Sequence, residues 1–154
     1  MGTRSITTVR SRWEGQGDYE THAVIYRHFD GYLSAQGQLV YDFLNGLSIV
    51  NGINSDTPKR HANGPGRLAA MLVVEMEEEG VSPDLCPDTS PCGQEFHYQI
   101  DVDYGMSDRN TATVTVFNGP ITAFGSGGED CTSRLFHGTV EEFGKFLLEQ
   151  NALA

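Results

Sequence analysis

The sequence predicts an α+β fold, in which an antiparallel β-sheet of about five or six strands is packed by about three helices in a single domain over residues 1–154. Several short segments alternate apolar and polar residues, as strands with one buried face do, and three others repeat apolar residues at helical spacing. At 154 residues the chain is long enough to bury a core without disulfides or metals.

The N-terminal segment predicts a β-hairpin. Residues 4–12 alternate and are rich in β-branched side chains, and residues 20–28 contain the run Ala23-Val-Ile-Tyr26. Gly15, Gly17 and Asp18 interrupt the pattern between them. The two strands should therefore pair antiparallel across a short turn.

Three helices are expected. Asp30-Gly31 turns the chain, Ser34 is a plausible N-cap for the first helix, and Asn45-Gly46 ends it. The second helix should run from about Arg67 to Glu79, after Asn63-Gly-Pro-Gly66. The third opens with the capping box Thr139-Val-Glu-Glu142. Their inward-facing apolar residues are expected to be Leu39, Val40, Phe43 and Leu44 in the first, Leu68, Met71, Leu72 and Met76 in the second, and Val140, Phe143, Phe146 and Leu147 in the third.

The second half of the chain predicts the remaining strands. Phe96–Tyr104 alternates strictly, with its aromatic and aliphatic residues on one face and His97, Gln99, Asp101 and Asp103 on the other, and 111–117 alternates again. Shorter strands are expected at 121–124 and 132–136. The segments 47–66 and 81–94 are rich in turn residues and are expected to be loops.

Charge and cysteine usage limit the classes of function. The formal net charge is −11, and residues 68–154 hold fifteen Asp/Glu against three Lys/Arg, whereas residues 1–67 hold six against seven. This disfavours direct nucleic-acid binding and attraction to anionic membranes. No apolar run is long enough to span a bilayer and no signal-peptide pattern is present, so a cytoplasmic location is expected. Cys86, Cys92 and Cys131 are predicted to be free thiols, and Cys86, Cys92 and His97 offer too few chelating pairs for a metal site.

The residues of greatest functional interest lie in two segments. Tyr26–Tyr32 brings an arginine, an imidazole and a carboxylate to the end of a strand, and there Arg27 is either a clamp on the turn or an anchor for phosphate. Asn63–Arg67 opens a helix whose exposed N–H groups favour an anion. If the two segments meet, they form one basic pocket. The predicted ligand-binding residues are Arg4, Arg27, Asp30, Tyr32, Gly64, Gly66 and Arg67.

Four segments together resemble a family of short, uncharacterised proteins of phages, prophages and bacterial genomes. They are Met1-Gly-Thr-Arg-Ser5, Tyr26-Arg-His-Phe-Asp-Gly-Tyr32, Asn51-Gly-Ile53 and Asn63-Gly-Pro-Gly66. The family's central segment commonly reads Y-R-Q-F-D-G-Y-P, so His28 and Leu33 depart from it, and a family glutamine could not serve as a base. The resemblance implies a phage-type origin, with host cytoplasm as the location, and assigns no activity.

Three functions follow as expectations, with binding favoured over catalysis because the sequence lacks a nucleophile elbow, a paired-carboxylate motif and HxxxH spacing. The first is non-enzymatic capture of a small phosphate-bearing, nucleotide-like ligand, as a counter-defence protein would do, with no cofactor. The second is an acidic inhibitor of a host defence protein that presents Glu75, Glu77, Glu78, Glu79, Asp101 and Asp103, in the manner of an anti-CRISPR or nucleic-acid mimic. The third is a small hydrolase or nucleotide-modifying enzyme at His28 and Asp30. An oligomeric state is left open.

Overall fold

The structure is a computed structural model that describes residues 2–13, 17–51, 60–88, 93–105, 110–119 and 134–152. Its strands are β1 (Ser5–Trp13), β2 (Glu20–Arg27), β3 (Ser48–Val50), β4 (His61–Asn63), β5 (Asp84–Leu85), β6 (Phe96–Tyr104), β7 (Thr111–Asn118) and β8 (Arg134–Thr139). Its helices are a π-helical turn η1 (Leu33–Gly37), α1 (Gln38–Leu44), α2 (Pro65–Glu78) and α3 (Val140–Ala152).

Six strands form one sheet in the order β5-β2-β1-β6-β7-β8, and β3 pairs with β4 in a second, two-stranded sheet. The β1–β2 hairpin is antiparallel as predicted, but β1 runs parallel to β6 along its whole length, from Ser5 beside Phe96 to Trp13 beside Tyr104. The α+β class and the strand number are confirmed, whereas the fully antiparallel sheet is wrong. The sheet is mixed because β2 pairs with only one edge of β1. β6, which is distant in the sequence, pairs with the other edge of β1 in parallel orientation.

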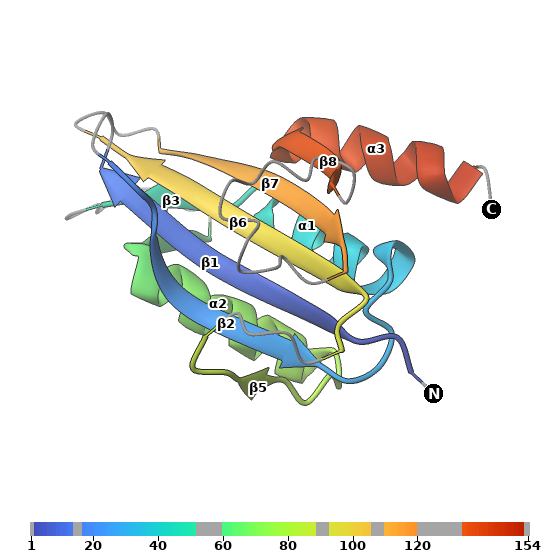
Figure 1. Cartoon of the computed structure of the whole chain (residues 1–154). Coiled ribbons are helices and arrows are strands. Elements are labelled where there is room, and N and C mark those ends of the chain that lie inside the picture. Colours follow the sequence, from blue (N-terminus) through green and yellow to red (C-terminus); the bar gives the residue numbers. More distant parts are fainter. Residues whose placement is uncertain are drawn as a thin grey trace.

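The α-helices all lie on one face of the six-stranded sheet (Figure 1). The apolar face of β6 packs beneath them, with Tyr98, Ile100 and Val102 fully buried. From the helices, the buried partners in this core are Val40 and Phe43 of α1, Leu68, Leu72 and Met76 of α2, and Phe143 and Leu147 of α3. The alternation predicted for 96–104 is confirmed, and the other face of the sheet carries its polar side chains.

Several element boundaries differ from expectation. Ser34 does not cap the first helix, because the chain already turns at Leu33, where the N–H groups of Ala35, Gln36 and Gly37 all lie within reach of the Tyr32 carbonyl. The expected loop 47–66 contains β3 and β4, and 81–94 contains the two-residue β5. β3 and β4 form because they bury Ile49 and Ala62. β5 forms because it pairs with β2.

The last helix begins as its capping box predicts. The Glu142 N–H lies 3.1 Å from Thr139 Oγ1, and the Thr139 N–H donates to Glu142 Oε1 over 2.8 Å. The expected strand at 121–124 lies outside the described residues, and the one expected at 132–136 is described from Arg134 onward, as β8. Within the described residues, no helix has the length and hydrophobicity that a membrane crossing requires.

Candidate functional site

The predicted residues Arg4, Arg27, Asp30 and Tyr32 lie together at one end of the sheet. The Gly31 N–H donates to the Thr3 carbonyl over 2.8 Å, and a Cβ on Gly31 would come within 2.9 Å of the Arg4 backbone carbon. Asp30 has a positive φ of 58°, which is uncommon for a residue with a side chain. The chain therefore passes too closely here for any residue but glycine at position 31.

Arg27 is a structural clamp. Its Nε donates to the Phe29 carbonyl over 2.5 Å and its Nη1 to Gln36 Oε1 over 2.8 Å, while Gln36 Nε2 donates to Thr7 Oγ1 over 2.9 Å. Gln36 is fully buried. These bonds fix the turn after β2 to the first helical turn and to β1. These bonds occupy the Arg27 N–H donors that a phosphate would need. The clamp is therefore the alternative that explains the position of the Arg27 side chain.

Gly64, Gly66 and Arg67 lie at the opposite end of the molecule. Arg27 lines a hollow together with Glu75 and Glu79, which lie at the C-terminal end of α2. Pro65, the first residue of α2, instead lines a cavity together with Trp13. Ser5 pairs with Arg27 at one end of β1 and Trp13 closes the other, so the length of α2, about 20 Å, separates the two segments. The single basic pocket expected from both segments is therefore wrong.

The histidine of the first segment faces outward. His28 Nε2 lies 3.5 Å from Asp84 Oδ2, and both side chains are more than half exposed. Ser34, the nucleophile that sequence proximity offers it, lines the hollow beside Arg27 instead. Among the described residues no three His, Cys, Asp or Glu side chains gather as metal ligands, and Cys92 lies outside those residues.

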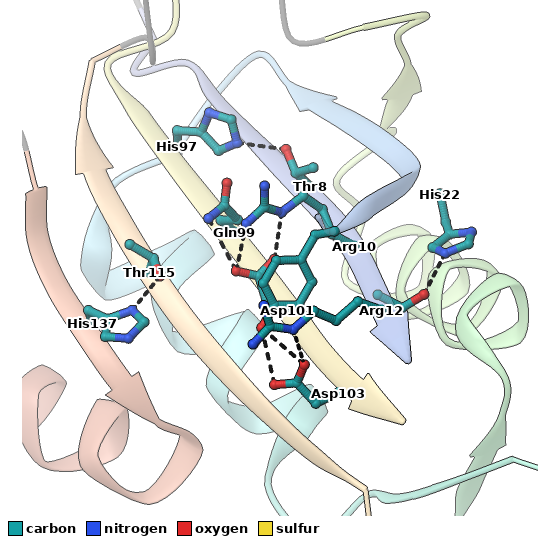
Figure 2. A network of polar contacts seen from close by, with 12 residues as sticks. Thr8, Arg10, Arg12, His22, His97, Gln99, Asp101, Asp103, Thr115 and His137 are labelled. Atoms are coloured by element: carbon teal, nitrogen blue, oxygen red, sulfur yellow. Dashed lines mark hydrogen bonds and ion pairs between the residues drawn. The ribbon is translucent and has the colours of Figure 1, made fainter. Parts of the chain in front are cut away.

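A ladder of ion pairs crosses the sheet face that the helices leave uncovered (Figure 2). Arg10 holds Asp101 through two bonds, Nε to Oδ1 over 2.6 Å and Nη2 to Oδ2 over 2.9 Å. Arg12 Nε donates to Asp103 Oδ1 over 2.5 Å. Both guanidinium groups stack on the ring of Tyr19, at 4.8 Å and 4.3 Å from its centre. The parallel β1–β6 register creates this ladder, because it sets each arginine beside an aspartate.

The ladder overturns the acidic surface expected from the sequence. Asp101 and Asp103 are paired with arginines on the uncovered sheet face, whereas Glu77, Glu78 and Glu79 end α2 on the helix face. The six carboxylates therefore do not form one surface, and three of them, Asp101, Asp103 and Glu75, already have cationic partners.

Two histidines flank the ladder. His97 Nε2 and Thr8 Oγ1 lie 2.6 Å apart in a buried site, and His137 Nδ1 lies 2.8 Å from Thr115 Oγ1 (Figure 2). Burial and the nearby charge of Arg10 lower the pKa of His97 from 6.5 to about 4. His97 is therefore neutral at physiological pH and holds the sheet together as a hydrogen-bonded core residue.

A cavity with functional side chains lies where α2 begins, against the far end of β1. It has a volume of about 370 Å³, which suits a small organic ligand. Its lining residues are Ser11, Arg12, Trp13, Asp18, Glu20, His22, Asn51, Pro65 and Tyr104. Arg12 lines the cavity, but its guanidinium is paired with Asp103, and the start of α2 adds the positive end of a helix dipole.

A β-bulge sets the geometry of the cavity. Val9 pairs with Ala23 and Arg10 with Thr21, so His22 is the extra residue of β2. The bulge carries the imidazole to the face of Ser11, where Nε2 lies 2.7 Å from Oγ. Tyr104, the neighbour of Trp13 across the β1–β6 pair, is buried, and no hydrogen bond to its hydroxyl is found in the described part of the chain. Burial raises the pKa of Tyr104 to about 12.

Sequence reasoning identified only the α2 side of this cavity. Gly64 has a φ of +91°, which only glycine adopts readily, and, like Gly66, it has open space where a Cβ would stand. The strand side was missed, since a bulge leaves no mark in the alternation of 20–28. The available sequence signal was Trp13, the one tryptophan of the chain, at the end of a segment that predicts a strand. No protein-family model, curated protein or solved structure matches the chain.

Proposed function

We propose that the protein captures a small phosphate-bearing, nucleotide-like ligand in the cavity between Trp13 and the start of α2. The observation that carries the proposal is the meeting of an exposed aromatic side chain, a histidine and a helix start in one cavity of about 370 Å³. A ligand with a flat ring and an anionic group would use all three.

The anionic group belongs at the first turn of α2. Gly64 is the N-cap residue and has no side chain with which to cap the helix, and Pro65 follows it at the cavity wall. The next two residues, Gly66 and Arg67, bring the N–H groups that a helix start leaves without intrahelical acceptors. A Cβ built on Gly66 would meet no heavy atom within 4 Å, so an oxygen has room to approach the backbone on that side.

The remaining lining groups define the rest of the ligand. Trp13 is 42% exposed and offers its ring for stacking, and Asp18 and Glu20 can accept hydrogen bonds from sugar hydroxyls or an exocyclic amine. The two carboxylates would repel additional phosphates. A nucleoside monophosphate therefore fits the cavity better than a triphosphate. For a phage-encoded protein, such capture would lower the concentration of a host signalling nucleotide.

Trp13 makes the test direct, because it is the one tryptophan of the chain and lines the cavity. Titration with a panel of linear and cyclic nucleoside monophosphates should change its fluorescence saturably for at least one member, and the matching triphosphate should bind at least about tenfold more weakly.

Calorimetry should then compare nucleotide affinity in the wild type and in Trp13→Ala, because this variant removes the stacking ring. Its affinity for the active nucleotide should fall by about tenfold or more. Phe29→Ala is the matched control, because Phe29 is 66% exposed and follows β2 at the other end of the molecule. A flat fluorescence response to the whole panel, or equal losses in the two variants, would refute the proposal.

A further inference from the structure

We infer that Ser11 and His22 form a nucleophile–base pair that hydrolyses small carboxylic esters in the cavity at the start of α2. The inference needs this cavity but not the phosphate-bearing ligand, so each can fail without the other. Its basis is the 2.7 Å contact between Ser11 Oγ and His22 Nε2, in a cavity with room for a small substrate.

The pair owes its existence to the β-bulge. In a regular hairpin His22 would stand opposite Arg10, on the sheet face that carries the ion-pair ladder. Because β1 pairs with Ala23 and Thr21 but not with His22, the bulge turns the His22 side chain to the face of Ser11 instead. A bulge interrupts the strand ladder, and bulges beside catalytic sites commonly serve to redirect a side chain. In Figure 2, His22 lies well apart from the ladder that Arg10 and Asp101 form.

Accessibility separates the roles of the two residues. Ser11 is only 8% exposed, so its hydroxyl is held in place by the sheet, whereas His22 is exposed and can exchange protons with water. With its own proton on Nδ1, the imidazole accepts the Ser11 hydroxyl hydrogen at Nε2. Glu20 lines the same cavity and is the nearest carboxylate along β2 for orienting the imidazole.

The chemistry is a two-step acyl transfer. Ser11 Oγ attacks the ester carbonyl carbon as its proton passes to His22 Nε2, the bond to the leaving alcohol breaks, and the alcohol takes up that proton. Water then attacks the acyl-serine, His22 takes its proton, and the carboxylic acid leaves as Ser11 Oγ regains a hydrogen. The start of α2 at the cavity wall supplies a positive dipole end for the developing oxyanion.

The first test is covalent labelling with a fluorophosphonate, followed by intact mass and peptide mapping. The Ser11 Oγ–P bond should form with loss of fluoride, giving one adduct on Ser11. Ser11→Ala should abolish the adduct. His22→Gln retains the nucleophile and changes only an exposed side chain, and it should slow labelling and p-nitrophenyl acetate hydrolysis by about a hundredfold.

Ser34→Ala and His28→Gln provide controls at the other end of the molecule, where Ser34 and His28 are exposed and do not line this cavity. Both should label at the wild-type rate. Absence of an adduct on Ser11, or labelling that is unchanged in His22→Gln, would overturn the inference and leave Ser11–His22 as a structural hydrogen bond. The Trp13 fluorescence titration reports on nucleotide capture independently of either result.

Discussion

At the scale of single residues, Gln36 joins three parts of the fold. It accepts from Arg27 and donates to Thr7, and it is fully buried. Gln36→Leu keeps most of the volume but leaves both partners without this bond. We expect the free energy of unfolding to fall by about 1–3 kcal/mol, measured by urea denaturation, because buried polar groups without partners are costly.

Gln38→Leu is the control for this change. Gln38 also donates from Nε2, to Asp42 Oδ1 over 2.9 Å, but this bond lies at the surface. Its loss should change stability by less than about 0.5 kcal/mol. Equal effects of the two substitutions would show that the buried chain of bonds from Arg27 to Thr7 contributes nothing particular.

His97 predicts how stability depends on pH. Its pKa is lowered to about 4 in the folded protein, against 6.5 when unfolded, so above pH 6.5 it is neutral in both states and has no effect. As the pH falls from 6.5 towards 4, the unfolded chain binds a proton that the folded protein excludes, and stability is lost progressively. The total loss is on the order of 3 kcal/mol.

His97→Gln should therefore reduce the slope of the unfolding free energy against pH between pH 6.5 and 5, where few carboxylates titrate. His137→Gln is the comparison, because His137 makes the same type of contact, with Thr115, but is exposed. That variant should retain the wild-type slope. A wild-type curve that is flat over this range would contradict the burial argument.

At the scale of elements, the sequence predicts what is local. The capping box at Thr139, the alternation of β6 and the apolar stripe of α2 are confirmed because each depends on neighbouring residues. The parallel partner of β1 could not be predicted, since Arg10 and Asp101 lie 91 residues apart in the chain. Such pairings are decided by how complete sheets and helices pack together.

The candidate site shows the same division between local and non-local information. The glycine-rich start of α2 is visible in the sequence, because Gly64 and Pro65 mark a helix N-terminus. The opposite wall depends on a bulge that moves His22 by one register position, and alternation alone places that residue on the wrong face. The sequence leaves Arg27 open between a clamp and a phosphate anchor, because its partner Gln36 is nine residues away, in a turn expected to be plain α-helix.

At the scale of the whole molecule, the two ends of the helix-covered face differ in electrostatics. The cavity lies at the positive end of the α2 dipole, and Glu77, Glu78 and Glu79 crowd the negative end. These glutamates oppose the dipole and repel one another. The acidic end therefore costs α2 some stability and adds to the net charge of −11.

Glu77→Lys, Glu78→Lys and Glu79→Lys together should stabilise the protein. Each change removes a negative charge and adds a positive one, so three changes move the net charge from −11 to −5 and complement the dipole of α2. We expect a gain of about 0.5–2 kcal/mol in the free energy of unfolding at low ionic strength, most of it lost in 1 M salt. Glu141→Lys, in the first turn of α3, should instead destabilise, since the dipole there favours a negative charge and Glu141 pairs with Lys145 over 3.7 Å. Stabilisation by both changes would mean that relief of net charge, rather than the helix dipole, dominates.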